Sequence, residues 1–428
     1  MLIEFFGRNF GSFRDEFHLS MLATDIDPGN DRGVLHVPIE GEEEPLRLLR
    51  CAAIYGPNAS GKSNLLRAAN ALKFLIGASG SFASDKPIHP YEPFLLDDKS
   101  CRNPVMLGLR AVVDTRLYEY MIEFNREEFL REELAQIGPK QDQHLFVRSK
   151  TAVSGPWTSH KQFELLTESF RQNALLLSLA DRLAPAIAGG LATGFVKLLD
   201  FHNQTIGPYS WFAHEYAAQA AREPTFANWL VSLLQGADTG IVDCEVVRAP
   251  RASERDQHEV RSPTQAERMR QPSRPKYRLQ FFHAGTEGAA RIPYWRESLG
   301  TRKIVELAPI VHELIFGDER RAYFVDEIAA SIHPVLLEAM IRRFNCEGKP
   351  ESVRGQLIFA THETTLLDAE AKDALLRRDQ IYLTDKDASG ASRLYSVAEF
   401  KERNNLNLRR RYLHGRYGAL PAVGSLGD

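Results

Sequence analysis

The sequence predicts an α/β fold with a mostly parallel sheet, an antiparallel β lobe and a helical insertion. Apolar runs that suit buried strands alternate with segments of helical spacing along most of the chain. One such strand runs through a glycine-rich turn directly into a helix, and a second strand far downstream ends in two acids. A strand, a glycine-rich turn and a helix in this order are typical of phosphate-binding sites.

The composition is that of an ordinary globular protein. Of the 428 residues, 43% are apolar and 25% are charged, and the net charge is -3. No run approaches the roughly 20 apolar residues of a membrane-spanning helix, and the N-terminus lacks a signal-peptide pattern. The four cysteines form no CxxC pair. We therefore expect a cytoplasmic protein without membrane attachment, in which nucleic-acid binding would need a local basic patch.

The periodicity predicts the elements in order. Strands are expected at 2–6, 16–22, 46–56, within 105–125 around a turn at 114–116, and at 241–247, 277–283, 321–326, 356–360 and 380–384. Helices are expected at 64–76, within 160–238, at 300–316 and 334–344, and from 364 onward. Residues 249–275 lack apolar periodicity and are expected to form a loop. We divide the chain into a first core part (1–135), a mainly helical insertion (136–240), a second core part (241–400) and a basic tail (401–428).

A phosphate-binding loop is predicted at residues 56–63, which fit the pattern G-x-x-x-x-G-K-[ST]. Glycines let the backbone curl so that its N–H groups point at phosphates, and the following helix adds its positive end. Lys62 supplies a cation for the β- and γ-phosphates, and the Ser63 hydroxyl can ligate Mg²⁺. The loop reads phosphates and not the base, so GTP is not excluded. The expected nucleotide-binding residues are Gly56, Pro57, Asn58, Ala59, Ser60, Gly61, Lys62, Ser63 and Asn64.

Two further strands end in polar residues suited to the same chemistry. The run AYFVDE ends in Asp326, which can hold Mg²⁺ through its water shell, and Glu327, which can polarise an attacking water. The run LIFATH ends in His362, which is placed to hydrogen-bond the γ-phosphate or that water. Adjacent acids and single histidines are often only surface groups. Here each follows an apolar strand, and the carboxyl ends of parallel strands are where such sheets bind ligands.

Ser298, Gly300 and Thr301 begin an apolar helix. Alone, Ser-x-Gly-Thr is an ordinary helix N-cap. Beside the other motifs it allows a second interpretation, because a helix N-terminus with a serine hydroxyl also binds anions. That anion would be the γ-phosphate of a nucleotide held by a second subunit.

In this order the motifs resemble the ABC-type ATPases of the SMC/RecF/OLD group, a group of P-loop NTPases. The resemblance is closest to the RloA-like, abortive-infection-type ATPases of anti-phage systems. It extends over nearly the whole chain through IEFFGRNFGSFRDEFHLSM, GPNASGKSNLLRA, ESLGT, FVDEIAASIHP, FATHETTLLD and RRRYLHGRYGALP. Three departures are the SxGT signature in place of LSGGQ, Gly11 where many relatives carry Arg or Lys, and no assignable Q-loop glutamine between 80 and 110.

The resemblance implies ATP and Mg²⁺ as ligands and a homodimer or higher homo-oligomer that sandwiches two ATP molecules. It implies Walker A at 56–63, Walker B at Asp326, catalytic roles for Glu327, Lys62 and His362, a signature at Ser298 and Gly300, and a D-loop at 331–333. The interval between Walker A and Walker B is too short for a long coiled coil and lacks heptads. The helical block is therefore a compact insertion and a candidate partner surface.

The resemblance also implies a role in defence. The ATPase would sense an invader and control a separate effector, a nuclease or toxin. Two alternatives stay open: a RecF-like repair factor that binds DNA directly, and a scaffold that binds ATP without hydrolysing it.

Two smaller motifs suggest contact with nucleic acid. Asp385 and Asp387 resemble the DxD of a Toprim nuclease, but too few residues follow for that domain, and a turn explains them. The basic tail could contact nucleic acid, or it could be a solvated helix end or a partner surface. Its members are Lys401, Arg403, Arg409, Arg410, Arg411 and Arg416, with Tyr412 and Tyr417.

Overall fold

The computed structural model describes residues 1–26, 31–139, 141–202, 217–218, 220–248, 277–286, 288–345, 354–367, 374–400 and 407–421. They fall into two compact units. Unit 1 comprises Met1–Asn203, Leu314–Ala329 and Glu338–Asp428, and unit 2 comprises Gln204–Glu313 and Ala330–Leu337. None of the helices in these ranges has the length and apolar character needed to cross a bilayer.

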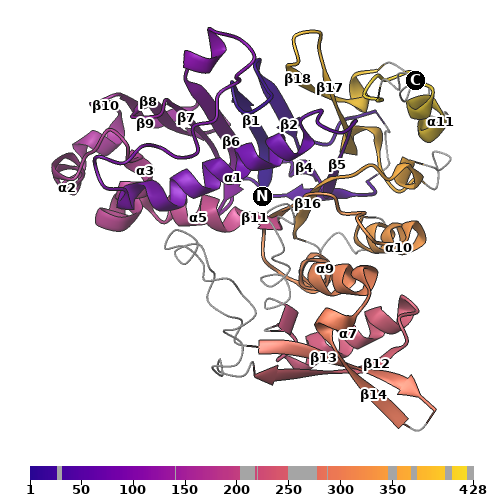
Figure 1. Cartoon of the computed structure of the whole chain (residues 1–428). Coiled ribbons are helices and arrows are strands. Elements are labelled where there is room, and N and C mark those ends of the chain that lie inside the picture. The colour runs from indigo at the N-terminus through magenta and orange to yellow at the C-terminus, as the bar shows by residue number, and fades with distance from the viewer. Residues whose placement is uncertain are drawn as a thin grey trace, which may run out of the picture. The chain divides into compact units, whose positions relative to one another are not determined.

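Unit 1 contains a six-stranded sheet of order β11-β15-β16-β5-β17-β18 (Figure 1). Its strands pair in parallel from β11 to β17, and β18 is antiparallel. They are β5 (Cys51–Tyr55), β11 (Leu199–His202), β15 (Ala322–Val325), β16 (Gln356–Ala360), β17 (Ile381–Lys386) and β18 (Ser392–Ser396). Strands β5, β15 and β16 are buried along their whole length, as expected for a parallel sheet covered on both faces. The predicted α/β fold with a mostly parallel sheet is confirmed.

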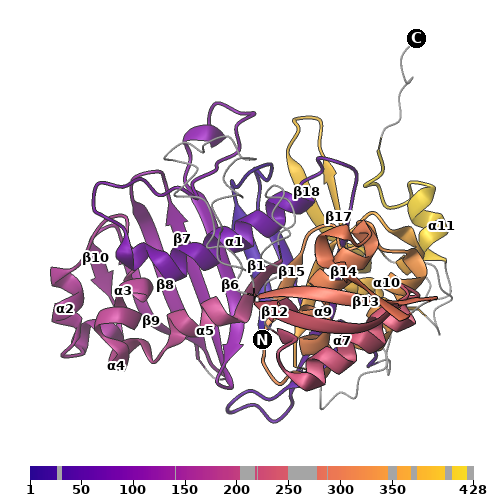
Figure 2. The ribbon, with the colours of Figure 1, turned by 60° about the horizontal axis from the view of Figure 1, so that its bottom comes forward.

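The predicted antiparallel lobe is a seven-stranded sheet of order β10-β9-β8-β7-β6-β1-β2. Its strands are β1 (Leu2–Arg8), β2 (Phe17–Ser20), β6 (Val105–Val113), β7 (Arg116–Phe124), β8 (Phe129–Ile137), β9 (Gln143–Ser149) and β10 (Ala152–Ser154). Along β7 every second side chain is buried, so one face of the sheet is covered. Figure 2 shows helices crossing that face, among them α1 and α5, which contact β6. A separate ribbon pairs β3 (Val34–Val37) with β4 (Leu46–Leu49).

Within the described residues, six α-helices lie entirely in unit 1. They are α1 (Lys62–Ala78), α2 (Phe163–Glu168), α3 (Leu176–Leu183), α4 (Pro185–Ala188), α5 (Leu191–Leu198) and α11 (Leu408–Leu413). The apolar face predicted for the first helix is buried, with Leu65, Leu72 and Leu75 at most 1% exposed. These side chains join one hydrophobic core with the inner face of the antiparallel sheet and with strands of the parallel sheet.

Unit 2 contains a three-stranded antiparallel sheet of β12 (Ile241–Arg248), β13 (Tyr277–Gly285) and β14 (Gly288–Pro293). Its helix α7 (Pro224–Gly236) shares a core with the sheet, through Leu230 and Leu279. Helices α9 (Leu299–Phe316) and α10 (Pro334–Asn345) each extend from unit 2 into unit 1 along the chain.

Some local predictions were wrong. The single strand predicted at 46–56 is two strands, because the chain changes partner at Arg50: β4 pairs with β3, whereas β5 enters the parallel sheet. Arg50 is buried, and its guanidinium donates to the Phe344 carbonyl at 3.2 Å. In place of the helix predicted from 364, the described residues form a 3-10 turn, Thr364–Leu367.

Other predictions fall outside the described residues. They include the loop at 249–275 and two basic residues of the tail, Lys401 and Arg403. The range predicted as a mainly helical insertion, 136–240, contains β9, β10 and β11 besides its helices. The division of the chain at 135, 240 and 400 stays a prediction.

Candidate functional site

Three neighbouring strands of the parallel sheet end at one edge, and a predicted site residue follows each. Gly56 comes directly after β5, Asp326 directly after β15, and His362 two residues after β16. Because the strands are parallel, their carboxyl ends lie side by side. The pairing continues past the end of β16, because Thr361 N–H donates to the carbonyl of Ile54, a residue of β5, at 3.1 Å. All three motifs therefore lie at the same edge of one hydrogen-bonded sheet.

The loop at 56–63 adopts backbone conformations that glycine favours. Gly56 has φ 153° and Gly61 has φ 117°, and Ala59 between them has φ 61°. A Cβ on Gly56 would lie 2.3 Å from the Thr384 carbonyl oxygen, so no other residue fits there without displacing β17. The side chain of Ser60 also reaches Thr384, with 2.6 Å between their hydroxyl oxygens. The loop is therefore held in its curled form by the neighbouring strand.

Lys62 stands at the start of α1, 4% exposed. Its ammonium donates to the carbonyls of Gly56 at 2.8 Å and Pro57 at 3.0 Å, so the side chain folds back across the loop. Burial lowers the pKa of Lys62, while the charges of Glu327 and Asp326 act to raise it. The N-cap of α1 is Gly61, which offers no side chain to the first N–H groups of the helix. Free N–H groups at a helix start, together with an ammonium, have the chemistry that suits an anion.

The acid pair has two unusual features. Asp326 is 2% exposed, yet among the described residues its Oδ1 has no hydrogen-bond partner. A buried carboxylate oxygen without a partner is energetically costly and is a common mark of a site that binds a ligand. Glu327 has φ 48°, a left-handed conformation that costs of order 1–3 kcal/mol for such a residue. Both the unpartnered oxygen and the left-handed backbone are energetically unfavourable, and both occur at the position predicted for Walker B.

His362 lies against this acid pair. Its Nε2 is 3.3 Å from Glu327 Oε1, and the two side chains are 42% and 38% exposed. Burial lowers the pKa of His362 and the charge of Lys62 lowers it further, while Glu327 and Asp326 act in the opposite direction. A neutral imidazole next to a carboxylate suits a water-orienting pair.

The residues present fit Mg²⁺. The orphaned oxygen of Asp326 is a hard acceptor, and Mg²⁺ prefers oxygen ligands and keeps several waters. Ser63, one residue after Lys62 on α1, is part-exposed and offers a second oxygen. Together they supply the two protein oxygens that P-loop enzymes commonly provide.

The N-terminal motif contributes contacts that the sequence did not predict. Ser12 Oγ accepts from Asn64 Nδ2 at 2.8 Å and from Ser392 Oγ at 2.7 Å. A Cβ on Gly61 would lie 2.5 Å from Ser392 Oγ. Gly11 has φ 59° and packs against Asn64. Gly11 and Ser12 of the N-terminal motif therefore pack against the predicted phosphate loop and the start of α1. No spacing in the sequence indicates this contact. Nucleotide contact by Asn64 stays a prediction.

The signature residues lie in unit 2. Ser298 Oγ accepts from Thr301 N–H at 3.0 Å, so Ser298 caps α9 as an ordinary N-cap serine does. A Cβ on Gly300 would lie 2.8 Å from the Ser331 carbonyl, which brings the start of α9 against the predicted D-loop. Ser331 has φ 64°. Only a glycine allows this close backbone approach.

The turn explanation is confirmed for Asp387, whereas Asp385 lies within β17, paired with Arg393 of β18. Asp387 Oδ1 accepts from the N–H groups of Ser389 at 2.8 Å and Ala391 at 3.0 Å, and Gly390 has φ 78°. Asp385 Oδ2 accepts from Tyr395 Oη at 3.1 Å. Both carboxylates are thus engaged in local structure.

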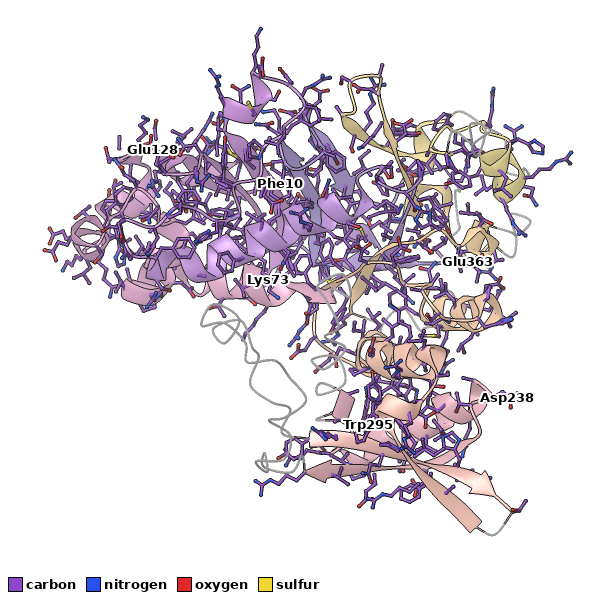
Figure 3. The ribbon with its side chains drawn as sticks, viewed as in Figure 1. Phe10, Lys73, Glu128, Asp238, Trp295 and Glu363 are labelled. Atoms are coloured by element: carbon purple, nitrogen blue, oxygen red, sulfur yellow. The ribbon has the colours of Figure 1, made fainter. Side chains whose placement is uncertain are left out.

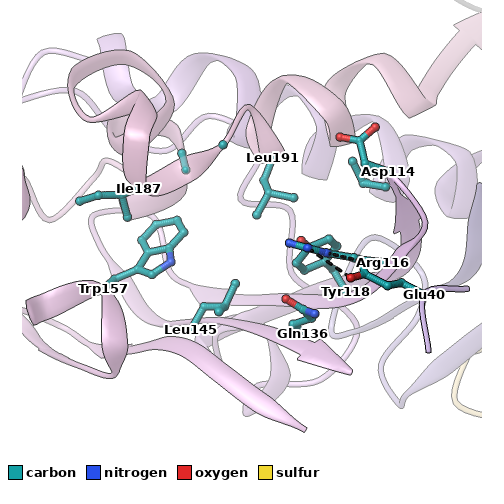
Figure 4. A pocket seen from close by; sticks show the side chains of 12 residues that line it. Glu40, Asp114, Arg116, Tyr118, Gln136, Leu145, Trp157, Ile187 and Leu191 are labelled. Carbon is teal, nitrogen blue, oxygen red and sulfur yellow. Dashed lines mark hydrogen bonds and ion pairs between the residues drawn. The ribbon is translucent and has the colours of Figure 1, made fainter. Parts of the chain in front are cut away.

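A cavity of about 430 Å³ lies elsewhere in unit 1, between the antiparallel sheet and helices α4 and α5 (Figure 4). Trp157, Leu145 and Leu191 form apolar walls. Arg116 also lines the cavity, and its Nε donates to Glu40 Oε2 at 2.6 Å. No residue of the phosphate site lines it, and its cation is already neutralised, so the cavity is not suited to phosphate.

Comparison with known proteins places the chain in a family. Residues 51–368 match the family described as "AAA domain, putative AbiEii toxin, Type IV TA system". No curated protein sequence gives a match. Among solved structures, an SMC head bound to the C-winged helix domain of ScpA is 12% identical, with TM-score 0.43, over 92% of this chain and 97% of that one. The SMC head domain from Thermotoga maritima is 15% identical, with TM-score 0.40, over 92% and 98%. Because the family match extends over most of the chain and includes both halves of the phosphate site, this protein belongs to that AAA domain family of P-loop ATPases.

Proposed function

We propose that this protein binds ATP with Mg²⁺ and hydrolyses it at the edge where β5, β15 and β16 end. One observation supports this above the others: a buried ammonium and a buried carboxylate with an unpartnered oxygen share that edge with a Glu–His pair. A purely structural cluster would satisfy its buried oxygens.

Each residue has a distinct part in the proposed reaction. Lys62 and the first N–H groups of α1 would bind the β- and γ-phosphates. Ser63 and Asp326 would hold Mg²⁺, which supplies positive charge against the phosphate oxygens. Glu327 would accept a proton as the water oxygen bonds to the γ-phosphorus and the bond to the β–γ bridging oxygen breaks. His362, 3.3 Å from Glu327, would orient that carboxylate.

A binding measurement tests the site directly. We expect MgATP to bind the wild-type protein by isothermal titration calorimetry and Lys62→Ala to weaken binding by at least about tenfold. Lys73→Ala is the matched control, because Lys73 is a part-buried lysine on the same helix that lies 5.7 Å over the Phe201 ring (Figure 3). Unchanged affinity in Lys62→Ala, or no affinity in the wild type, would overturn the proposal.

We further propose that two copies share each nucleotide, with Ser298 of one copy reaching the phosphates held by the other. The exposed position of Ser298 at the N-terminus of a long helix supports this. A complementation experiment tests it. Lys62→Ala and Ser298→Arg should each be inactive alone, and an equimolar mixture should recover about a quarter of wild-type turnover, since half of the dimers then carry one intact site. No recovery on mixing, despite dimers in light scattering, would contradict a shared site.

The family description names a putative AbiEii toxin and a type IV TA system, and on that basis we propose that this ATPase regulates a separate toxic effector during phage infection. Opening and closing of the dimer would then control the effector. We expect the gene and its neighbours to protect cells in a phage plating assay and Glu327→Gln to abolish protection. Turnover stimulated by DNA ends without any effector would instead favour direct action on DNA.

A further inference from the structure

We infer that the C-terminal segment 407–421 positions the switch loop that carries His362, acting through Tyr412, Tyr55 and the backbone of Glu363. This inference rests on the proposed function, because it assigns positioning residues to the same nucleotide site. No motif of the sequence predicted a link between the basic, aromatic tail and that loop.

Tyr55 is the first part of the link. It is the last residue of β5, directly before Gly56, and it is fully buried. Its hydroxyl donates to the carbonyl of Glu363 at 3.0 Å, and Glu363, labelled in Figure 3, directly follows His362. One phenol therefore joins the base of the phosphate loop to the residue next to the switch histidine.

Tyr412, on α11, is the second part. Its ring meets that of Tyr55 edge-on, with centroids 5.8 Å apart and planes at 62°. It is 7% exposed, and its hydroxyl donates to the Ala419 carbonyl at 3.0 Å. Ala419 has φ 54° and lies in the closing GRYGALP motif. The turn after α11 thus fixes Tyr412, and Tyr412 limits where Tyr55 can move.

A second contact joins α11 to the same loop. Arg409 Nε donates to Thr364 Oγ1 at 3.3 Å, one residue beyond Glu363. The helix itself is capped by Asn407, whose Oδ1 accepts from Arg410 N–H at 2.7 Å. The helix therefore touches the switch loop directly at Thr364, through Arg409, and reaches the neighbouring Glu363 indirectly, through Tyr412 and Tyr55.

These contacts matter because His362 is held weakly by its own side chain. The imidazole is 42% exposed, so packing contributes little to its position. Its place relative to Glu327 therefore depends on the backbone on either side, where Thr361 N–H bonds to the Ile54 carbonyl and the Glu363 carbonyl accepts from Tyr55. A shift of about 1 Å in a positioned group can reduce a rate by up to about a hundredfold. The C-terminal segment is therefore expected to affect turnover more than nucleotide binding.

The test compares two buried tyrosines in the same sheet. Tyr55→Phe removes the hydroxyl to Glu363 and keeps the ring, and we expect kcat for ATP to fall about tenfold while KM and the Kd of MgATP change less than about twofold. Tyr382→Phe is the matched control: Tyr382 on β17 is 6% exposed and donates to the Ser20 carbonyl at 2.8 Å, away from the switch loop. It should lose similar thermal stability and keep wild-type kcat.

Equal kcat in the two phenylalanine variants would overturn the inference. A second measurement covers the tail: Tyr412→Leu should lower kcat, and combining it with Tyr55→Phe should add less than the sum of the two effects, because both act through one loop. Additive losses would also overturn it. A wild-type protein without ATP turnover would refute the proposed function itself, whereas active wild type with equal phenylalanine variants would refute only this inference.

Discussion

Two buried ionic clusters of unit 1 differ in how completely their charges are satisfied. Glu132 and Arg148 are both fully buried and pair at 3.3 Å. Glu132 accepts from Tyr120 Oη at 2.8 Å and from two N–H groups at the start of α3, at 2.6 and 2.9 Å. Arg148 donates to the carbonyls of Lys150 at 2.7 Å and Ala174 at 2.6 Å. Every charge in this cluster is matched within the protein.

In the cluster at the edge of the parallel sheet, the charged groups are not all satisfied by protein partners. Asp326 leaves a buried oxygen without a partner among the described residues, and Glu327 carries a left-handed backbone. Lys62 bonds to carbonyls of its own loop. The comparison teaches that burial of charge alone does not mark a functional site. The candidate site differs from the Glu132–Arg148 cluster in having a buried carboxylate oxygen that a ligand would have to satisfy.

Breaking the satisfied cluster should have the largest effect. Arg148→Met leaves the buried Glu132 without its cation, and we expect a loss of about 3–5 kcal/mol in the free energy of unfolding. Urea denaturation measures it. Arg131→Met, on the same sheet but 53% exposed, should change stability by less than about 0.5 kcal/mol. If Arg148→Met lowers the free energy of unfolding by less than about 1 kcal/mol, the Glu132–Arg148 pair does not contribute substantially to stability.

Removing the proposed base should affect turnover and not folding. Glu327→Gln keeps the size of the side chain but cannot accept the proton, and we expect kcat to fall about a hundredfold or more with MgATP affinity retained. Phosphate-release kinetics check this. The control is Glu128→Gln, which removes a part-buried carboxylate 3.2 Å from the Lys150 ammonium, away from the candidate site. Turnover near wild type in Glu327→Gln would assign Glu327 no catalytic part.

Two buried aspartates provide the sharpest stability comparison. Asp379 is 3% exposed and accepts from Arg377 Nε at 2.9 Å and from Thr24 N–H at 2.8 Å. We expect Asp379→Asn to lose about 2–3 kcal/mol. Asp326→Asn should lose nothing and gain about 1 kcal/mol, because it removes a buried charge with an unmet oxygen.

Thermal denaturation without nucleotide compares the two variants. Stabilisation of the wild type by MgATP should disappear in Asp326→Asn. If the two substitutions cost the same, Asp326 would be a structural carboxylate like Asp379.

The same contrast explains what the sequence could predict. The phosphate loop is contiguous, so its chemistry and its position between strand and helix were readable. Asp326 and His362 were predicted as site residues because each follows an apolar strand, and that role stays a prediction. The fold class and the hairpin around 114–116 followed from periodicity. The Glu132–Arg148 pair was not predicted, because charged residues in strands usually face solvent and the carbonyls that bind Arg148 belong to a later segment.

Tyr55 escaped prediction for a similar reason. It ends an apolar run, where a tyrosine is expected to be plain core, and its partners come from segments more than 300 residues away. The change of sheet at Arg50 also depends on pairing between distant strands, which a local pattern does not encode.

The smallest expected effect concerns the proton on His362. Burial is the first cause of its lowered pKa and the charge of Lys62 is the second, so Lys62→Met should raise the pKa of His362 toward its ordinary value of 6.5. Imidazole NMR titration measures this, with Lys73→Met as a control that should leave it unchanged.

Because the folded protein holds this proton less tightly than the unfolded chain, the contribution to stability is present above about pH 6.5 and is lost as pH falls through the folded pKa. With 42% of the side chain exposed, solvent screening keeps that contribution small. A pKa that falls in Lys62→Met would show that the ammonium does not act on this histidine, and the contrast between the two clusters would then rest on the carboxylates alone.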